Sequence, residues 1–159
     1  PGLRLGYLVV PKQLTNACIK AKNLMTGQTP LVEQATVAEF IAAGHFVRHL
    51  GKMRLLYQDK LEAILRACQK HLADYADPVY SGAGMHIVLI LKSKSINHNI
   101  SDLEVVEALK ERHIFCSALS AYYIGKAIKQ GLVLGFANTP ADEMDQKIAI
   151  IRQVLSSTY

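Results

Sequence analysis

The sequence predicts an α+β fold of two layers, in which helices cover a small β-sheet and a long helix precedes that sheet. Three observations predict this class. The second half of the chain reads as strand, helix, strand, strand and helix. Apolar residues recur every three or four positions through residues 45–74, as on one face of a helix. Residues 5–10 form an apolar run that three helical patterns separate from these strands, so we expect this run to stay outside the main sheet.

The first half of the chain opens on an apolar run and continues with helical patterns. Residues 5–10 include two valines and predict a buried strand. Pro11 is well placed to open a helix that ends at Gly27, and Pro30 opens a second helix that ends at Gly44.

The long helix predicted over residues 45–74 has about eight turns, which is typical of a helix that bridges two domains. Gly51 inside it costs about 1 kcal/mol relative to Ala, which suggests that close packing requires a glycine there.

The second half carries the sheet. Residues 75–84 predict a linker rich in turns, and we expect Ser81-Gly82-Ala83-Gly84 to form a turn rather than a phosphate loop, because it precedes a strand and not a helix. Ser101 and Glu104 predict a capping box at the start of a helix. The strands are expected at residues 85–91, 114–119 and 131–137, and the helices at residues 101–112 and 142–155.

The composition permits one domain, or a small domain with a piece of another, in 159 residues. The net charge is +5, but acidic residues are interspersed among the basic ones, which favours a mixed surface over a dedicated nucleic-acid face. Cys18, Cys68 and Cys116 are odd in number and far apart, which argues against disulfides and a zinc site. No apolar run reaches the roughly 20 residues that span a bilayer, and the chain has no signal-peptide pattern. We therefore expect a soluble, cytoplasmic protein with no membrane partner.

Spacing alone offers few candidate site residues. His45 and His49 lie four apart on the long helix, but no third ligand is obvious near them, so we expect histidines of the helix surface and no metal site. Tyr122 and Tyr123 follow a predicted strand and have two equal interpretations, the lining of a pocket or the edge of the core. No nucleophile with its base can be assembled from spacing.

Four motifs point to a family. The opening Pro1-Gly2-Leu3-Arg4-Leu5-Gly6-Tyr7-Leu8-Val9-Val10-Pro11 resembles the segment after the Schiff-base lysine in fold-type I proteins that depend on pyridoxal 5'-phosphate (PLP). It is most similar to the MocR type of bacterial regulator, in which a winged-helix DNA-binding module of the GntR kind is fused to an aminotransferase-like body. The other motifs agree in order along the whole chain: Phe40-Ile41-Ala42-Ala43-Gly44-His45-Phe46 with His49-Leu50, Met53-Arg54 and Tyr57, then Gly84-Met85-His86, then residues 131–137.

This resemblance implies the small C-terminal domain of the fold-type I fold with its long interdomain helix. Residues 1–27 would be a remnant of the large PLP-binding domain, namely its last strand and the following helix, and residues 28–159 the small domain. Arg4 matches the arginine that contacts the PLP phosphate, a role that suits a bidentate guanidinium; a surface arginine beside a strand is the alternative. The Schiff-base lysine would lie a few residues before Pro1. The resemblance therefore implies PLP in the intact protein, no catalytic residue in this chain and no PLP bound to the chain alone.

Two positions depart from the family pattern. Gly51 stands where the family usually has arginine. Val133 stands where related transaminases place the arginine that binds the α-carboxylate of the substrate, and a valine cannot form that ion pair. This change argues against efficient transamination of ordinary α-amino acids and is compatible with ligand sensing.

The sequence therefore predicts the C-terminal part of the PLP-binding, effector-sensing domain of a MocR-type transcriptional regulator. The intact protein would form a homodimer, sense a small amine, an amino acid or PLP, and bind DNA through a winged-helix domain that precedes the chain. The lack of an initiator Met and the immediate apolar run predict a fragment. The alternatives are the small domain of a genuine class I/II aminotransferase and a cofactor-free interaction domain. The sequence before Pro1 would distinguish them, by a winged helix with Ser-Lys, Ser-Lys alone, or neither.

Overall fold

The computed structural model describes residues 4–27, 30–92 and 101–157. Contacts divide the chain into two compact units, residues 1–53 and 54–159, and each is described by itself. The division falls inside one continuous helix, α3 (His45–Leu72). It is a division by contacts and does not test the domain boundary predicted between residues 27 and 28, which stays a prediction. Among the described residues, no helix combines the length and the apolar character needed to cross a bilayer.

The first unit is helical. It contains the short 3-10 turn η1 (Lys12–Leu14), α1 (Thr15–Thr26), α2 (Leu31–Ala42) and the first turns of α3. The helices end as the sequence predicts, because Gly27 and Gly44 adopt positive φ angles of 60° and 74° that disfavour other residues.

Residues 5–10 do not form the predicted strand within this chain. This segment pairs with no described strand, and the side chains of Tyr7, Leu8 and Val9 are 85–90% exposed. A run with strand propensity becomes a strand only where a neighbour takes up its backbone hydrogen bonds. The related expectation, that this run stays outside the main sheet, is confirmed.

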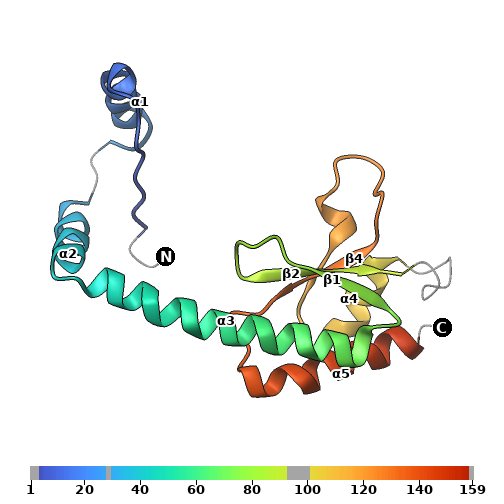
Figure 1. Ribbon diagram of the computed structural model, residues 1–159. Helices are drawn as coiled ribbons and strands as arrows, with labels where there is room; N and C mark the ends of the chain where they lie inside the picture. Colours follow the sequence, from blue (N-terminus) through green and yellow to red (C-terminus); the bar gives the residue numbers. More distant parts are fainter. Residues whose placement is uncertain (1–3, 28–29, 93–100, 158–159) are drawn as a thin grey trace. The chain divides into compact units, whose positions relative to one another are not determined.

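The second unit is built on an antiparallel sheet of four strands in the order β1-β2-β4-β3. Figure 1 labels β1, β2 and β4 of this sheet. The strands are β1 (Ala76–Val79), β2 (His86–Leu91), β3 (Ser117–Ala118) and β4 (Gly131–Gly135). β2 and β4 are the central pair, with His86 opposite Gly135 and Ile90 opposite Gly131.

Two predictions for this sheet are wrong. The segment 75–84 is not only a linker, because it contains the edge strand β1, in which Pro78 lies opposite Leu89. Proline is tolerated on an edge strand, where its missing N–H faces no partner. The strand predicted at residues 114–119 shrinks to Ser117–Ala118, since only these two residues are in register with β4.

Helices cover one face of the sheet. Alternate residues of a strand point to opposite faces, and Ile87, Leu89, Leu132 and Leu134 point into the core. The helices that pack on them are the C-terminal part of α3, α4 (Asp102–Lys110) and α5 (Met144–Ser157), which a 3-10 turn, η3 (Ala141–Glu143), precedes. Their buried apolar residues are Ile64, Ala67, Cys68, Leu72, Val105, Leu109, Met144, Ile148, Ile151, Val154 and Leu155. The opposite face of the sheet, which these helices do not cover, carries the candidate site.

Polar contacts fix the helix ends. The predicted capping box is present, because Glu104 N donates to Ser101 Oγ at 3.4 Å and Ser101 N donates to the Glu104 carboxylate at 2.7 Å. This backbone hydrogen bond lowers the pKa of Glu104. Between α3 and α5, the Asp145 carboxylate lies 3.0 Å from Lys70 Nζ and 3.0 Å from His71 Nε2, and these partners lower the pKa of Asp145.

Candidate functional site

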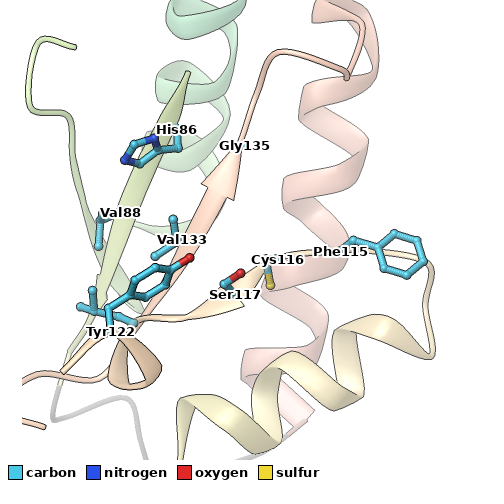
Figure 2. A pocket seen from close by; sticks show the side chains of 9 residues that line it. His86, Val88, Phe115, Cys116, Ser117, Tyr122, Val133 and Gly135 are labelled. Carbon is cyan, nitrogen blue, oxygen red and sulfur yellow. The ribbon is translucent and has the colours of Figure 1, made fainter. Parts of the chain in front are cut away.

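The uncovered face of the sheet carries a concave surface of about 630 Å³. Its floor is one row across three strands, formed by Val88 of β2, Val133 of β4 and Ser117 of β3. Strand register sets this row, because Val133 lies opposite Val88 on one side and opposite Ser117 on the other. Figure 2 shows these side chains on the same face as the Tyr122 ring. We call this concave surface the sheet-face hollow.

His86 borders the sheet-face hollow near one end of β2, and glycines make room for it. Its register partner Gly135 has no side chain, so the surface is open beside the imidazole. A Cβ on Gly84 would lie 3.2 Å from His86 Cε1, and Gly84 adopts a φ of +81°. The imidazole therefore lies against a glycine that no other residue replaces without strain.

Tyr122 borders the hollow from the 3-10 turn η2 (Leu119–Tyr122), which follows β3 directly. Its side chain is 66% exposed. Leu119, from the same turn, adds an apolar contribution to the lining. The hollow thus has an apolar floor, an aromatic wall and hydrogen-bonding groups on His86, Ser117 and Tyr122.

Asp102 holds this arrangement together from below. It is fully buried, and its carboxylate accepts hydrogen bonds from Ser120 Oγ, from Ser120 N at 2.9 Å and from Gly131 N at 2.9 Å. Its own N–H donates to Gln130 Oε1 at 2.8 Å. One side chain at the start of α4 therefore fixes η2, which carries Tyr122, and the first residue of β4, which carries Val133.

Sequence reasoning missed Asp102. An aspartate directly after the N-cap Ser101 is favoured at any helix start by the helix dipole, so its type and place do not distinguish a buried anchor from a solvated acid. Only the return of the chain at Ser120 and Gly131 supplies its hydrogen-bond donors.

Cys116 also lines the hollow, and its thiol is not an activated nucleophile. Desolvation by burial raises the pKa of Cys116 to about 11 and that of Cys68 to about 12. The thiolate is the reactive form, so both thiols are protonated and inert near neutral pH. Phe115 is 76% exposed and in Figure 2 points away from the other lining residues.

Arg4, the residue predicted to contact the PLP phosphate, belongs to the first unit and not to the lining of the sheet-face hollow. It is exposed and has a φ of +51°, which is uncommon for a residue other than glycine. None of the ion pairs formed between described residues includes it, so its guanidinium is open to an anion.

The remaining candidates are placed as follows. The His45 ring stacks on Phe40, with 5.6 Å between ring centroids. Over residues 4–27, 30–92 and 101–157, no three metal-ligating side chains gather in one place. Tyr122 lines the hollow, as the first of the two interpretations of this pair predicts, whereas Tyr123 does not. The predicted turn at residues 81–84 is present, with Ser81 Oγ donating to Ala83 O at 3.3 Å.

Comparison with known proteins agrees with this architecture. The family described as aminotransferase class I and II matches residues 1–151. The chain belongs to this family. It is similar to the α-aminoadipate aminotransferase LysN of Thermus thermophilus, whose crystal structure contains N-(5'-phosphopyridoxyl)-L-leucine, with a TM-score of 0.84 at 19% identity over 99% of this chain and 39% of that one. The predicted α+β class, of the fold-type I kind, is confirmed.

Among curated proteins, the domain matches regulators of the MocR type. It is 32% identical over 153 residues to the probable rhizopine catabolism regulatory protein MocR of Rhizobium meliloti. The matched region covers 96% of this chain and 30% of that protein. It is 25% identical over 160 residues to the pyridoxine biosynthesis transcriptional regulator PdxR of Corynebacterium glutamicum, covering 98% of this chain and 32% of that protein. The chain thus spans about a third of the length of these relatives.

Proposed function

We propose that this chain is the C-terminal part of the PLP-binding, effector-sensing domain of a MocR-type transcriptional regulator. The observation that carries the proposal is the match to two such regulators over nearly the whole chain and about a third of their own length. The longer protein would bind DNA through an N-terminal winged-helix domain, act as a homodimer and reside in the cytoplasm.

The residues of this chain fit one part of PLP. Arg4 offers an exposed guanidinium that can bind a phosphate dianion in a bidentate manner. The only carboxylate that is fully buried among the described residues, that of Asp102, is occupied by three donors and is not available to a pyridine nitrogen. PLP, when bound, supplies an electrophilic carbon for amines. The chain would therefore contribute Arg4, which would bind the PLP phosphate. The Schiff-base lysine and the residue that pairs with the pyridine nitrogen would belong to the preceding sequence.

The uncovered face of the sheet is the part of this chain that we assign to the effector. It is open and has a defined lining. The buried carboxylate of Asp102 fixes η2, which carries the Tyr122 wall, and the first residue of β4, which carries Val133 of the floor. Ligand sites are commonly concave and largely apolar, with a few convergent polar groups, which describes the sheet-face hollow.

The test uses the longer protein, including the sequence before Pro1. We expect stoichiometric PLP, mapped to one upstream lysine after borohydride reduction and mass spectrometry, and specific binding of a DNA duplex from the upstream region of a neighbouring gene. Arg4→Ala is expected to weaken PLP binding by about tenfold to a hundredfold, since it removes a charge-assisted pair. The exposed Arg152→Ala variant is the matched control and should bind PLP as the unmodified protein does. A longer protein without PLP or without DNA binding would contradict the proposal.

Membership of the aminotransferase family favours a second function, the small domain of a genuine aminotransferase. The two functions make opposite predictions for turnover of amino acids by the longer protein. Val133 lines the hollow and offers no charge to an α-carboxylate, so we expect no efficient transamination with ordinary α-amino acids. Rapid conversion of added PLP to its amine form by several amino acids would instead establish the aminotransferase.

A further inference from the structure

We propose that one face of the first turns of α3 binds the phosphate backbone of DNA, in addition to the winged-helix domain expected before this chain. The face consists of His45, Arg48, His49 and Lys52, and we call it the basic face. This inference rests on the proposed function, because it adds a second contact between the same regulator and its DNA. It is carried by the distribution of charge, by the spacing of these side chains and by the start of the helix.

The net charge of the chain is unevenly distributed. Residues 1–53 contain six Lys and Arg and two acidic residues, so this first unit holds +4 of the total charge of +5. The two acidic residues, Glu33 and Glu39, both lie on α2, and neither forms an ion pair with a described residue. The ion pairs between described residues all lie in the second unit. The mixed surface predicted from the sequence is therefore a property of the second unit, and the first unit is basic.

Helical spacing brings the side chains of the basic face together. Its members follow His45 by three, four and seven residues, so they lie on one side of α3 over about 10 Å of its axis. All four side chains are exposed. The apolar residues Phe46, Leu50 and Met53 repeat at the same spacing on another side of the helix. A protein surface that covers this apolar side would therefore leave the basic face in water.

The start of α3 also favours an anion. The free N–H groups at a helix N-terminus carry partial positive charge, which acidic side chains commonly balance in the first turn. α3 has no acidic residue in its first turn and carries His45 and Arg48 there instead. Cations are unfavourable at this end of a helix, so a bound phosphate would interact favourably with the helix dipole and with the basic side chains together.

The DNA backbone fits the length and the charge of the basic face. Each strand of a duplex presents one phosphate about every 3.4 Å along the axis, so the face spans about three successive phosphates. Arg48 can bind a phosphate in a bidentate manner, and Lys52 supplies a point charge one turn further along the helix. Contacts of this kind add affinity and salt dependence, whereas sequence preference comes from base contacts.

The experiment measures binding of the full 159-residue chain to a DNA duplex of mixed sequence by fluorescence anisotropy, from about 20 to about 150 mM salt. We expect the logarithm of the binding constant to fall with the logarithm of the salt concentration, with a slope of about −2 or steeper. Arg48→Gln with Lys52→Gln should reduce the magnitude of this slope by about 2, since two phosphate contacts are lost. At about 50 mM salt, binding should weaken at least about tenfold.

Lys126→Gln with Lys129→Gln is the matched control. These exposed lysines of the second unit lie three residues apart, and their loss changes the net charge by the same amount. The control should keep the salt slope of the unmodified chain. An equal loss in both variants would mean that net charge alone attracts DNA, and would overturn the proposal. A chain that does not bind the duplex at about 20 mM salt would overturn it as well.

Amide chemical shifts in the ¹⁵N-labelled chain locate the contact. We expect the duplex to shift the amides of residues 45–52, and dispersed spectra show that each variant is folded. Shifts confined to the second unit would contradict the basic face. A polyglutamate peptide of equal charge should bind more weakly than the duplex, because it releases fewer condensed counterions. Equal binding of this peptide would identify an acidic protein as the partner in place of DNA.

This proposal and the proposed function fail in different ways. Binding of the duplex by the 159-residue chain tests the basic face without PLP. In the longer protein, Arg48→Gln with Lys52→Gln should leave PLP stoichiometry and the preferred DNA sequence unchanged and should lower only the affinity and the salt slope. A longer protein that binds PLP and DNA but does not respond to this variant would contradict the basic face alone. One that lacks PLP or DNA binding would contradict the regulator.

Discussion

Asp102 shows how one buried carboxylate can organise a surface that it does not touch. Its acceptor oxygens satisfy donors from η2 and from β4, which are separated by a loop of the chain and which carry Tyr122 and Val133. A buried polar group is tolerated because each of its hydrogen bonds is made, and removing the acceptor leaves the donors without partners in the interior.

Asp102→Ala is therefore expected to lower the free energy of unfolding by about 3 kcal/mol, since Ser120 N, Ser120 Oγ and Gly131 N lose their acceptor together. Urea denaturation followed by circular dichroism measures this change. The exposed Asp142→Asn variant should stay within about 0.5 kcal/mol of the unmodified chain. A loss below about 1 kcal/mol for Asp102→Ala would show that water replaces the carboxylate and that the anchor is dispensable.

The cysteines allow a second prediction at the residue scale. Burial raises the pKa of Cys68 to about 12, so a thiol reagent at neutral pH should not label it in the native chain and should label it readily in urea. Burial favours the protonated thiol, and the native state is therefore expected to lose stability as pH rises from about 9 towards 12. Mass mapping after a short pulse of reagent checks the first point, with Cys18, which is only half-buried, as the internal comparison. Labelling of Cys68 as fast as Cys18 would mean that α3 opens in the native state.

At the scale of elements, local signals were sufficient for helices and insufficient for strands. The apolar stripe of α3 and the capping box of α4 depend on residues three or four apart, and both are present. Strands depend on distant partners. The run at residues 5–10 has strand propensity but pairs with no described strand, whereas β1, which contains Asp77 and Pro78, exists because β2 lies beside it.

The same contrast holds for the candidate site. The position of Val133 within its strand was visible in the sequence, and so was the possibility that Tyr122 lines a pocket. Their common face was not, because it follows from the register of β2, β3 and β4. The role of Asp102 could not be predicted for the same reason, since its hydrogen-bond partners lie 18 and 29 residues further along the chain.

Gly51 and Gly131 differ in whether the structure leaves room for a side chain at that position. The expectation that Gly51 permits close packing finds no support within this chain, because a Cβ built there meets no atom within 4 Å. Gly51→Ala should therefore stabilise α3 by about 0.5–1 kcal/mol, as helix propensity dictates. Thermal unfolding of the chain measures the effect. A destabilised Gly51→Ala chain would reveal packing of that face against another copy.

Gly131→Ala is the opposite case and the comparison for Gly51→Ala. A Cβ at position 131 would lie 2.6 Å from the backbone oxygen of Leu89, so β2 and β4 would have to move apart. We expect a loss of about 2 kcal/mol or more in the free energy of unfolding. The amides of β2 should also shift, which links the change to the sheet.

For the molecule as a whole, the fit of its residues to PLP predicts what the chain does alone. Mixed with PLP and then reduced with borohydride, the 159-residue chain should give no stoichiometric adduct at a single lysine, because the family resemblance places the cofactor lysine before Pro1. Slow, scattered modification of exposed lysines is the expected background. Lys94 merits separate mapping, since it directly follows Ser93, although both lie outside the described residues. A complete adduct at Lys94 would show that the chain carries its own cofactor lysine and would contradict the proposed division of the site.

The last prediction concerns association, and it follows from the apolar side chains that the helices leave in solvent. On α2, Leu31 and Val32 are 78% and 76% exposed, and on α3 Val47 and Leu55 are 71% and 67% exposed. Contiguous apolar patches beyond a few hundred Å² are uncommon on soluble monomers, because association of two molecules removes such apolar surface from water. We expect the chain to self-associate through these helices, with an interface of roughly 1,000 Å² or more. Sedimentation over a range of concentrations measures the association.

Leu31→Glu with Val32→Glu should shift the chain to monomer, whereas Leu103→Glu, at an exposed position of α4, should not. A clean monomer at high concentration would mean that these side chains are tolerated in water, and would weaken the prediction that this chain is a fragment of a longer protein.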